Sequence, residues 1–227
     1  MAIELKKVIP LGRNLSEYTA MFGLAKQDLQ LSILDCGGGP SSFNYEVKNM
    51  GGNVTSIDPI YTFSATEIQS RIDETFDDMM RQAENNKDKF VWDSIKSMQV
   101  LRETRKNAMQ LFIEDYENGK LEGRYLFQEL PELCFNNETF DLALSSHFLF
   151  LYSDILSYEF HRDAIAEMLR VAREVRIFPL VDLNIIKSGY VAKITDEFRK
   201  RCCSVDVIKV DYEFQKGANE YMKIASG

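Results

Sequence analysis

The sequence predicts an α/β protein with a doubly wound, mostly parallel sheet, and three observations lead to that prediction. Short apolar runs alternate along the chain with segments of helical periodicity, as expected when helices connect the strands of one sheet. The apolar run at 31–36 ends in three consecutive glycines, which is typical of a buried strand followed by a tight turn. Two strand-like segments, 205–214 and 219–225, flank Gly217 and predict a terminal antiparallel hairpin.

Each expected element has its own local signal. Apolar residues near one face predict a helix within 14–29, and Ser41 or Ser42 can cap a second helix over 42–50. The segment NVTSIDP predicts a second strand that stops at Pro59. Further along the chain, strands are predicted at 124–130, 140–145 and 175–183, and helices at 158–172 and 188–202.

Residues 63–122 interrupt this alternation. Apolar residues recur every three or four positions and predict two helices, over about 64–84 and 91–117. A crossover between parallel strands requires only one helix, so the segment is interpreted as an insertion. We expect a cofactor-binding domain over 1–62 and 123–227, with 63–122 as a helical cap. An element for dimerisation is the alternative interpretation of the same apolar faces.

Composition limits the classes of function. The 227 residues have a formal net charge of −8, which disfavours broad binding to nucleic acid or anionic membranes. The four cysteines, at 36, 134, 202 and 203, show neither a CxxC motif nor a Cys–His spacing suited to a metal. We therefore expect no metal site and no secreted disulfide framework.

No apolar run approaches the roughly 20 residues of a membrane span. The first thirteen residues, MAIELKKVIPLGR, lack the apolar core of a secretory signal. These observations favour a cytoplasmic protein.

The glycine turn carries the first functional signal. Gly37, Gly38 and Gly39 permit close approach of a ligand to the backbone, and Asp58 ends the next strand. A carboxylate at that place accepts hydrogen bonds from ribose hydroxyls. The glycines can instead serve only a tight turn, with Asp58 solvated. The dinucleotide fingerprint has a third glycine where this chain has Ser42, which disfavours a nicotinamide or flavin.

Several segments in the same order resemble the class I S-adenosylmethionine-dependent methyltransferases. ILDCGGGPSSF is similar to the first motif of that family and VTSIDP to its second. The stretch ELPELCFNNETFDLALSSHFLFLY resembles the region from the adenine side to the substrate side. The resemblance covers roughly 30–60 and 124–225 and looks closest to an uncharacterised bacterial branch. It implies a seven-stranded, Rossmann-like methyltransferase fold with S-adenosylmethionine as cofactor.

The resemblance also implies roles for individual residues. The glycines Gly37, Gly38 and Gly39 would line the methionine and ribose part of the cofactor, with Asp35 near its amino group. Asp58 would hold the ribose hydroxyls, and Pro59 and Ile60 would flank the adenine. Glu129 stands where the family usually has an aspartate that accepts from the adenine amino group, and Leu130 follows it. The residues expected beneath the transferable methyl group are Ser145, Ser146 and His147.

Other candidates lie around this region. His147 is interpreted either as a general base or substrate partner, or as a structural histidine. Tyr152 and Tyr158, with Asp154 between them, are candidates for substrate recognition or for a solvated loop. Arg13 can pair with the cofactor carboxylate, although a solvated position is the preferred interpretation.

The sequence thus predicts methyl transfer from S-adenosylmethionine to a small-molecule or side-chain acceptor. A non-catalytic protein that binds S-adenosylmethionine or S-adenosylhomocysteine is an alternative, because the motifs describe cofactor binding. An NAD-dependent oxidoreductase is the second alternative, against which Ser42 and the terminal hairpin argue.

Overall fold

The structure is a computed structural model that describes residues 11–227. The predictions about residues 1–10, including the lack of a signal sequence, lie outside this described part. The strands are β1 (Ser32–Cys36), β2 (Asn53–Ile57), β3 (Tyr125–Leu126), β4 (Phe140–Ser146), β5 (Ala172–Phe178), β6 (Ser204–Lys209) and β7 (Glu220–Ala225). The α-helices are α1 (Leu15–Phe22), α2 (Phe43–Asn49), α3 (Ala65–Asn85), α4 (Met98–Leu121), α5 (Tyr158–Val171) and α6 (Tyr190–Lys200).

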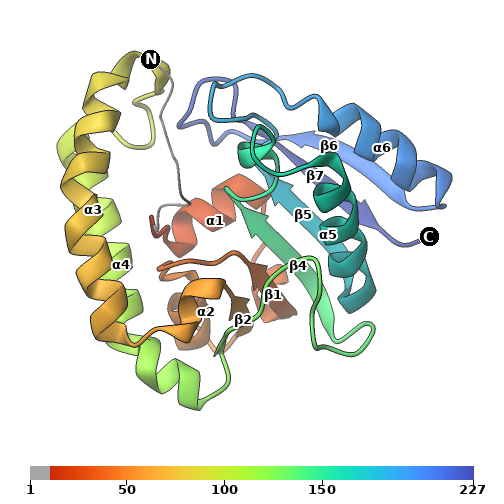
Figure 1. Ribbon diagram of the computed structural model, residues 1–227, viewed down its shortest axis with the longest axis horizontal. Helices are drawn as coiled ribbons and strands as arrows, with labels where there is room; N and C mark the ends of the chain where they lie inside the picture. The colour runs from red at the N-terminus through yellow and green to blue at the C-terminus, as the bar shows by residue number, and fades with distance from the viewer. Residues whose placement is uncertain (1–10) are drawn as a thin grey trace.

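The strands form one seven-stranded sheet in the order β3-β2-β1-β4-β5-β7-β6 (Figure 1). The first five strands pair in parallel, and β7 runs antiparallel to both β5 and β6. The predicted doubly wound sheet and its antiparallel C-terminal strands are therefore confirmed. Because the order reverses between β1 and β4, the carboxyl ends of these strands border a crevice suited to a ligand.

Two layers of helix cover the sheet. One apolar cluster lies between the sheet and helices α5 and α6, and includes Ala143, Val175 and Ile194. The other lies on the opposite face beneath α1 and α2, and includes Phe22 and Phe43. Both faces of the central strands are thus buried, as expected for nearly continuous apolar strands in a parallel sheet.

Some element boundaries differ from the predictions for local physical reasons. Helix α1 ends at Phe22 because Gly23 adopts a left-handed conformation, with φ of 59°, and caps it. Strand β3 comprises only two residues of the predicted 124–130. Helix α4 begins seven residues later than predicted, because the backbone of Val91 donates to the carbonyl of Phe214 in the C-terminal loop.

Helices α3 and α4 form a long antiparallel pair beside the β3 edge of the sheet (Figure 1). Their facing apolar side chains make a third cluster with Tyr61 and Tyr125 from the main sheet region. The segment predicted as an insertion is therefore a packed helical hairpin that shares a core with the sheet edge.

Two buried ion pairs fix α4 to the rest of the protein. The guanidinium of Arg105 donates to both carboxylate oxygens of Glu17 on α1, at 2.5 and 2.6 Å. Arg124, just before β3, makes two bonds of 2.7 Å to Asp115 of α4. It also donates to Asn44 of α2 at 2.7 Å. Two parallel N–H···O bonds fix direction as well as distance, so these pairs set the orientation of α4.

The first prediction concerns the Arg105–Glu17 pair, whose side chains are only 1% and 7% exposed. Glu17→Gln would leave the Arg105 cation buried without its carboxylate. We expect the free energy of unfolding in urea to fall by roughly 3–5 kcal/mol. Glu74→Gln is the control, because Glu74 forms an exposed pair with Arg71 and its loss should have little effect. Equal stability of the two variants would contradict the structural role of Glu17.

Candidate active site

The glycine turn lies between β1 and α2 at the carboxyl edge of the sheet. Gly37 and Gly39 have φ angles of 71° and 55°, which disfavour any other residue. At Gly38 an added Cβ would lie 2.4 Å from Oδ2 of Asp35, so a side chain there would collide. An added Cβ at Gly39 would meet nothing within 4 Å, which shows that the backbone there borders open space.

Asp58 follows β2 and joins this turn from the neighbouring strand. Its Oδ2 accepts from the backbone N–H of Gly39 at 3.0 Å, and its Oδ1 accepts from Ile60 at 2.9 Å. Burial raises the pKa of Asp58, although both backbone donors act in the opposite direction. Each carboxylate oxygen retains a further lone pair, so the group can accept two more hydrogen bonds.

Asp35 lies beneath the turn rather than in the cavity wall. Its carboxylate accepts from the hydroxyls of Tyr18 at 3.0 Å and Ser56 at 3.1 Å. Burial raises the pKa of Asp35 to about 7, while those two hydrogen bonds oppose the shift and the nearby Asp58 adds to it. The side chain therefore ties α1 to β1 and β2 under the glycines.

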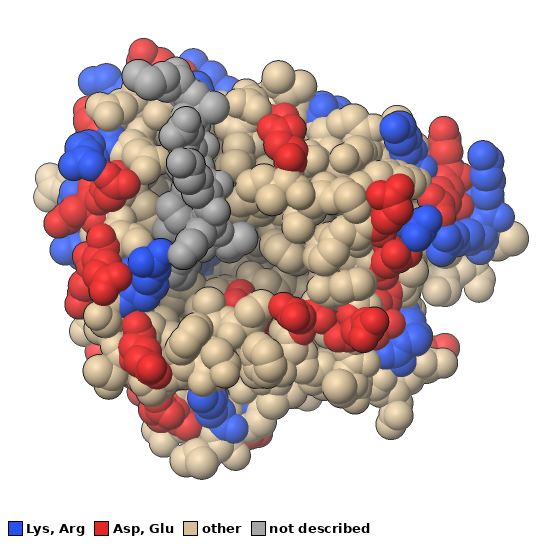
Figure 2. All heavy atoms as spheres, viewed as in Figure 1, with Lys and Arg blue, Asp and Glu red and all other residues tan. Residues whose placement is uncertain are grey.

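A cavity of about 580 Å³ opens above the turn. In space-filling view this face of the molecule is hollowed near its centre (Figure 2). One side of the cavity is formed by the glycine turn, Asp58, Ile60 and the loop at 128–130. The opposite side is formed mainly by apolar residues of α3, α4 and the C-terminal loop. Its volume lies within the usual range of small-molecule sites, roughly 300–1,000 Å³.

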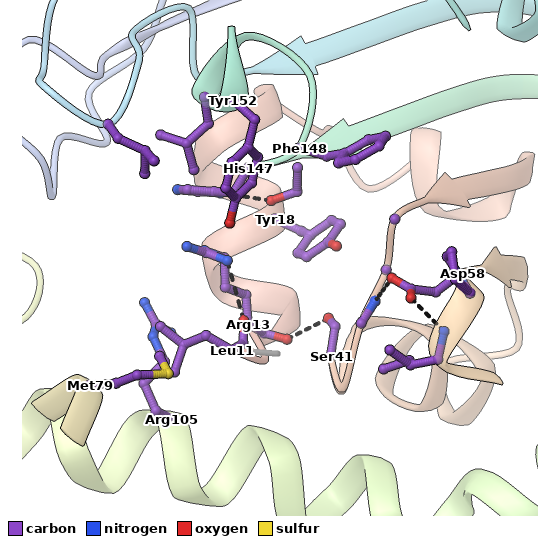
Figure 3. Close-up of a pocket in the computed structure, with 18 of the residues that line it drawn as sticks. Leu11, Arg13, Tyr18, Ser41, Asp58, Met79, Arg105, His147, Phe148 and Tyr152 are labelled. Atoms are coloured by element: carbon purple, nitrogen blue, oxygen red, sulfur yellow. Dashed lines mark hydrogen bonds between the residues drawn. The ribbon is translucent and has the colours of Figure 1, made fainter. Parts of the chain in front are cut away.

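Two arginines project from the wall of the cavity between these sides (Figure 3). Arg105 is paired with Glu17, whereas Arg13 forms no salt bridge with any carboxylate of residues 11–227. The Nε atom of Arg13 is buried without a hydrogen-bond partner. Burial and the Arg105 guanidinium lower the pKa of Arg13. Arg13 is thus partly buried rather than solvated, and its Nη1 donates to the carbonyl of Leu11 at 3.3 Å. Its backbone carbonyl accepts from Ser41 and Ser42, which hold it against the glycine turn.

His147 lies at the end of β4, facing Arg13 (Figure 3). Its backbone has a φ of 53°, and its N–H donates to the carbonyl of Phe178 at 2.7 Å. The ring Nδ1 is 2.9 Å from the hydroxyl of Ser146. Burial, together with the cations Arg13 and Arg105, lowers the pKa of His147 well below its usual value. The imidazole is therefore neutral near pH 7 and can accept a proton.

The apolar side of the cavity is closed by an aromatic contact between distant segments. Phe90, in the α3–α4 connection, stacks on Phe214 of the C-terminal loop with ring centroids 4.7 Å apart. The backbones of 89–91 and 214–216 form an antiparallel bridge beside this stack. Met79 and Leu101 complete the apolar wall.

The structure brings most of the predicted site residues to one cavity. Those that line it are Gly37, Gly38, Gly39, Asp58, Pro59, Ile60, Glu129, Leu130, Ser146, His147 and Tyr152. Asp35 and Ser145 lie behind them in β1 and β4.

Tyr158 does not line the cavity, contrary to the expectation of substrate recognition. It begins α5, its hydroxyl donates to Glu197 of α6, and its ring packs edge-on against Tyr190. Its role in the structure is to join these two helices. Asp154 is exposed and accepts from Asn184 at 3.1 Å.

Sequence reasoning missed several residues of the cavity wall. In the sequence, Arg105 is one of many charged residues of a predicted amphipathic helix. Phe214 and Gln215 read as the end of a strand and the start of a turn. The only available signal for Arg105 was its position on the apolar face of α4, in line with Leu101, Ala108 and Phe112.

Residues 11–227 present neither a cluster of metal ligands nor a membrane-spanning helix. No cluster of three or more His, Cys, Asp or Glu side chains there has an arrangement suited to a metal ion. None of the helices in that range combines the length and apolarity of a membrane span.

Comparison with known proteins finds a relative in an archaeon. The chain is 37% identical over 223 residues to "Uncharacterized protein MJ0045" of Methanocaldococcus jannaschii, and the match covers 98% of each protein. The predicted bacterial branch stays a prediction, since this relative is archaeal. No model of a known protein family matches the chain.

Solved structures provide similarity of fold. WbdD, described as a bifunctional kinase-methyltransferase, has a TM-score of 0.50 at 11% identity, covering 93% of this chain and 34% of WbdD. The magnesium protoporphyrin IX methyltransferase of Synechocystis PCC 6803, solved with bound SAM, has a TM-score of 0.49 at 11% identity. That alignment covers 94% of this chain and 78% of the methyltransferase. At such identities the similarity concerns the fold alone.

The second prediction follows from the buried carboxyl of Asp35. Its pKa is about 7 in the folded protein, against about 3.9 in an unfolded chain. Between these values the folded state binds more protons, so the stabilisation is fully present at low pH and is lost as pH rises through 7. Relative to Asp35→Asn, which does not titrate, the wild type should lose at most about 4 kcal/mol of unfolding free energy from pH 4 to 8.

Asp141→Asn provides the opposite control for this titration. Hydrogen bonds from the backbone N–H and hydroxyl of Ser32 lower the pKa of Asp141. Its contribution is therefore present above pH 4 and lost as pH falls. In urea unfolding, the stability of wild type relative to Asp35→Asn should fall as pH rises from about 4 to 8. The stability of wild type relative to Asp141→Asn should instead be constant over that range and fall as pH is lowered below about 4. Parallel slopes for Asp35→Asn and wild type would contradict the raised pKa.

Proposed function

The chain belongs to the same protein family as MJ0045 of Methanocaldococcus jannaschii, and we propose that it is an S-adenosylmethionine-dependent methyltransferase. The observation that carries the proposal is the joint arrangement of the glycine turn and Asp58. An open glycine backbone and a carboxylate with two free acceptor positions border one cavity at the switch point of the sheet.

The residues present fit this cofactor. The side of the cavity near β2 has one buried carboxylate for two ribose hydroxyls and the apolar side chains of Ile60 and Leu130 for a purine ring. The lack of steric obstruction at Gly39 leaves room for a sugar or an amino-acid chain against the backbone. In this proposal Glu129 borders the adenine edge.

The cofactor supplies a methyl group already activated on a sulfonium sulfur. What remains for the protein is to position the acceptor in line with that methyl group and to exclude water. The apolar wall made by α3, α4 and Phe214 suits the second task. We therefore propose that 63–122 acts as a cap over the acceptor side, although its helices also share a core with the sheet edge.

Isothermal titration calorimetry tests the function at the level of the cofactor. S-adenosylmethionine and S-adenosylhomocysteine should both bind to the full chain with one site. NAD serves as the comparison, because it shares the adenosine ribose but needs room for a second nucleotide. Tighter binding of NAD than of both adenosyl ligands would overturn the proposal.

The third prediction concerns Asp58→Asn. The amide keeps the size of the side chain and one acceptor oxygen, but it loses the charge and one of the acceptor oxygens. Since a hydrogen bond to a charged group contributes about 1.5–3 kcal/mol, the dissociation constant for S-adenosylhomocysteine should rise by roughly 10- to 150-fold. Asp206→Asn is the matched control, because Asp206 is exposed in β6 and does not line the cavity, and it should leave the affinity unchanged.

The thermal midpoint without ligand must be recorded for both variants. Asp58 also accepts from Gly39 and Ile60, so part of its effect can be a loosening of the turn. Unchanged affinity of Asp58→Asn would show that the ribose lies elsewhere.

A further inference from the structure

The proposed cofactor site leaves one group of polar side chains in the cavity without a role. Arg13 and His147 face each other across the space between the glycine turn and the apolar wall (Figure 3). Arg13 carries a charge that no carboxylate of residues 11–227 pairs with, and its Nε lacks a partner. A cation whose Nε is buried without a partner is costly unless an anion or a strong acceptor approaches it.

The ionised groups around Arg13 have both signs, because Glu17 as well as Arg105 acts on its guanidinium. Arg105 and Glu17 neutralise each other, so Arg13 leaves one net positive charge. Among the described residues, the carboxylates that line the cavity are Asp58 and Glu129, which follow β2 and β3 in the chain. An ammonium group near Arg13 would therefore meet a net positive charge. An oxygen that develops negative charge would be stabilised there.

The space beyond these groups is mainly apolar, although Gln82 and Gln215 also line it. Met79, Phe90, Leu101 and Phe214 form its wall, and their rings and thioether offer contact to a flat apolar body. His147 completes the polar end. The imidazole is uncharged near pH 7, and the tautomer in which Nδ1 donates to Ser146 leaves Nε2 as the acceptor.

We propose that the methyl acceptor is a small apolar molecule with an acidic hydroxyl, phenolic or enolic, which Arg13 and His147 recognise together. The inference rests on the proposed methyltransferase function and gives its substrate class. It assigns Arg13 to the acceptor oxygen rather than to the carboxylate of the cofactor.

The step balances with the groups named. The hydroxyl gives its proton to Nε2 of His147, while a lone pair of its oxygen forms the new bond to the methyl carbon. The bond from that carbon to sulfur breaks, and its electron pair stays on sulfur. The products are a methyl ether, S-adenosylhomocysteine and an imidazolium that returns its proton to solvent. Negative charge growing on the oxygen beside Arg13 offsets the cations that disfavour a charged imidazole.

The test uses 2-naphthol, 2-naphthoate and 2-naphthylmethylamine, which share one apolar body. Each is titrated by calorimetry into the full chain saturated with S-adenosylhomocysteine, so that no turnover occurs. We expect 2-naphthol to bind at least tenfold more tightly than the amine. The ultraviolet spectrum of bound 2-naphthol should show ionisation about 1–3 pH units below that of the free compound, as expected for a cation within hydrogen-bond distance.

Two substitutions at position 13 separate charge from folding. Arg13→Gln should return the ionisation of bound 2-naphthol toward that of the free compound. Arg13→Lys keeps the charge and should retain most of the shift. Thermal midpoints of both variants show whether the fold is kept, and Arg201→Gln, at the far end of α6 where Arg201 pairs with Glu197, controls for a general change in net charge.

Several outcomes would overturn the inference. Tighter binding of 2-naphthoate or the amine than of 2-naphthol would show that the acceptor is not an acidic hydroxyl. In another outcome, Arg13→Gln weakens the binding of S-adenosylhomocysteine but leaves the binding of 5′-methylthioadenosine, which lacks the amino-acid part, unchanged. That result would assign Arg13 to the cofactor carboxylate. Failure of S-adenosylhomocysteine to bind the wild type would overturn the proposed function as well, whereas the other outcomes leave it intact.

Discussion

The bidentate ion pair between Arg105 and Glu17 is the contact on which the rest of the site depends. It joins α4 of the inserted hairpin to α1, which packs on the sheet beside the glycine turn. Glu17 also completes the capping box of α1 with Asn14 and accepts from Tyr212 of the C-terminal segment at 3.2 Å. One carboxylate therefore connects three parts of the chain that lie far apart in sequence. Separating Arg105 from Glu17 would leave each charge buried without its partner, which is strongly destabilising. The three parts are therefore held in one arrangement, and the cavity wall forms between them.

The fold and the position of the glycine turn and Asp58 at one cavity could be predicted from the sequence because their signals are local. A buried strand, a glycine turn and an acid after the next strand occupy fewer than thirty residues, and each follows from backbone conformation or strand polarity. The parallel order of β1, β2 and β4 then brings Gly37–Gly39, Asp58 and His147 to one edge without further information. The same reasoning located the antiparallel hairpin, since Gly217 has the positive φ expected of its turn.

The apolar side of the cavity could not be predicted, because it is determined by contacts between distant segments. Periodicity placed Arg105 on a helix but not opposite Glu17, 88 residues away. The sequence around Phe90 and Phe214 has no local feature that predicts the stacking of their rings. The backbone bridge at Phe90 also explains why α4 begins later in the chain than predicted. Tyr158 is the opposite case, a residue that was predicted for the site but does not line the cavity. It lies near His147 in sequence, but the helix that begins at Tyr158 turns its side chain toward α6. Proximity along a loop is therefore weaker information than position at a strand end.

The two backbone hydrogen bonds to Asp58 have a consequence for the thermodynamics of ligand capture. A free aspartate on a surface would lose rotational freedom when it met a ligand, and that loss would oppose association. Here Gly39 and Ile60 already fix both carboxylate oxygens during folding. The ordering entropy, on the order of 1 kcal/mol for a short polar side chain, is thus part of the folding reaction. Because the Asp58 side chain is already ordered, binding of a ligand loses little of its conformational entropy. More of the free energy of the ligand's hydrogen bonds therefore contributes to affinity.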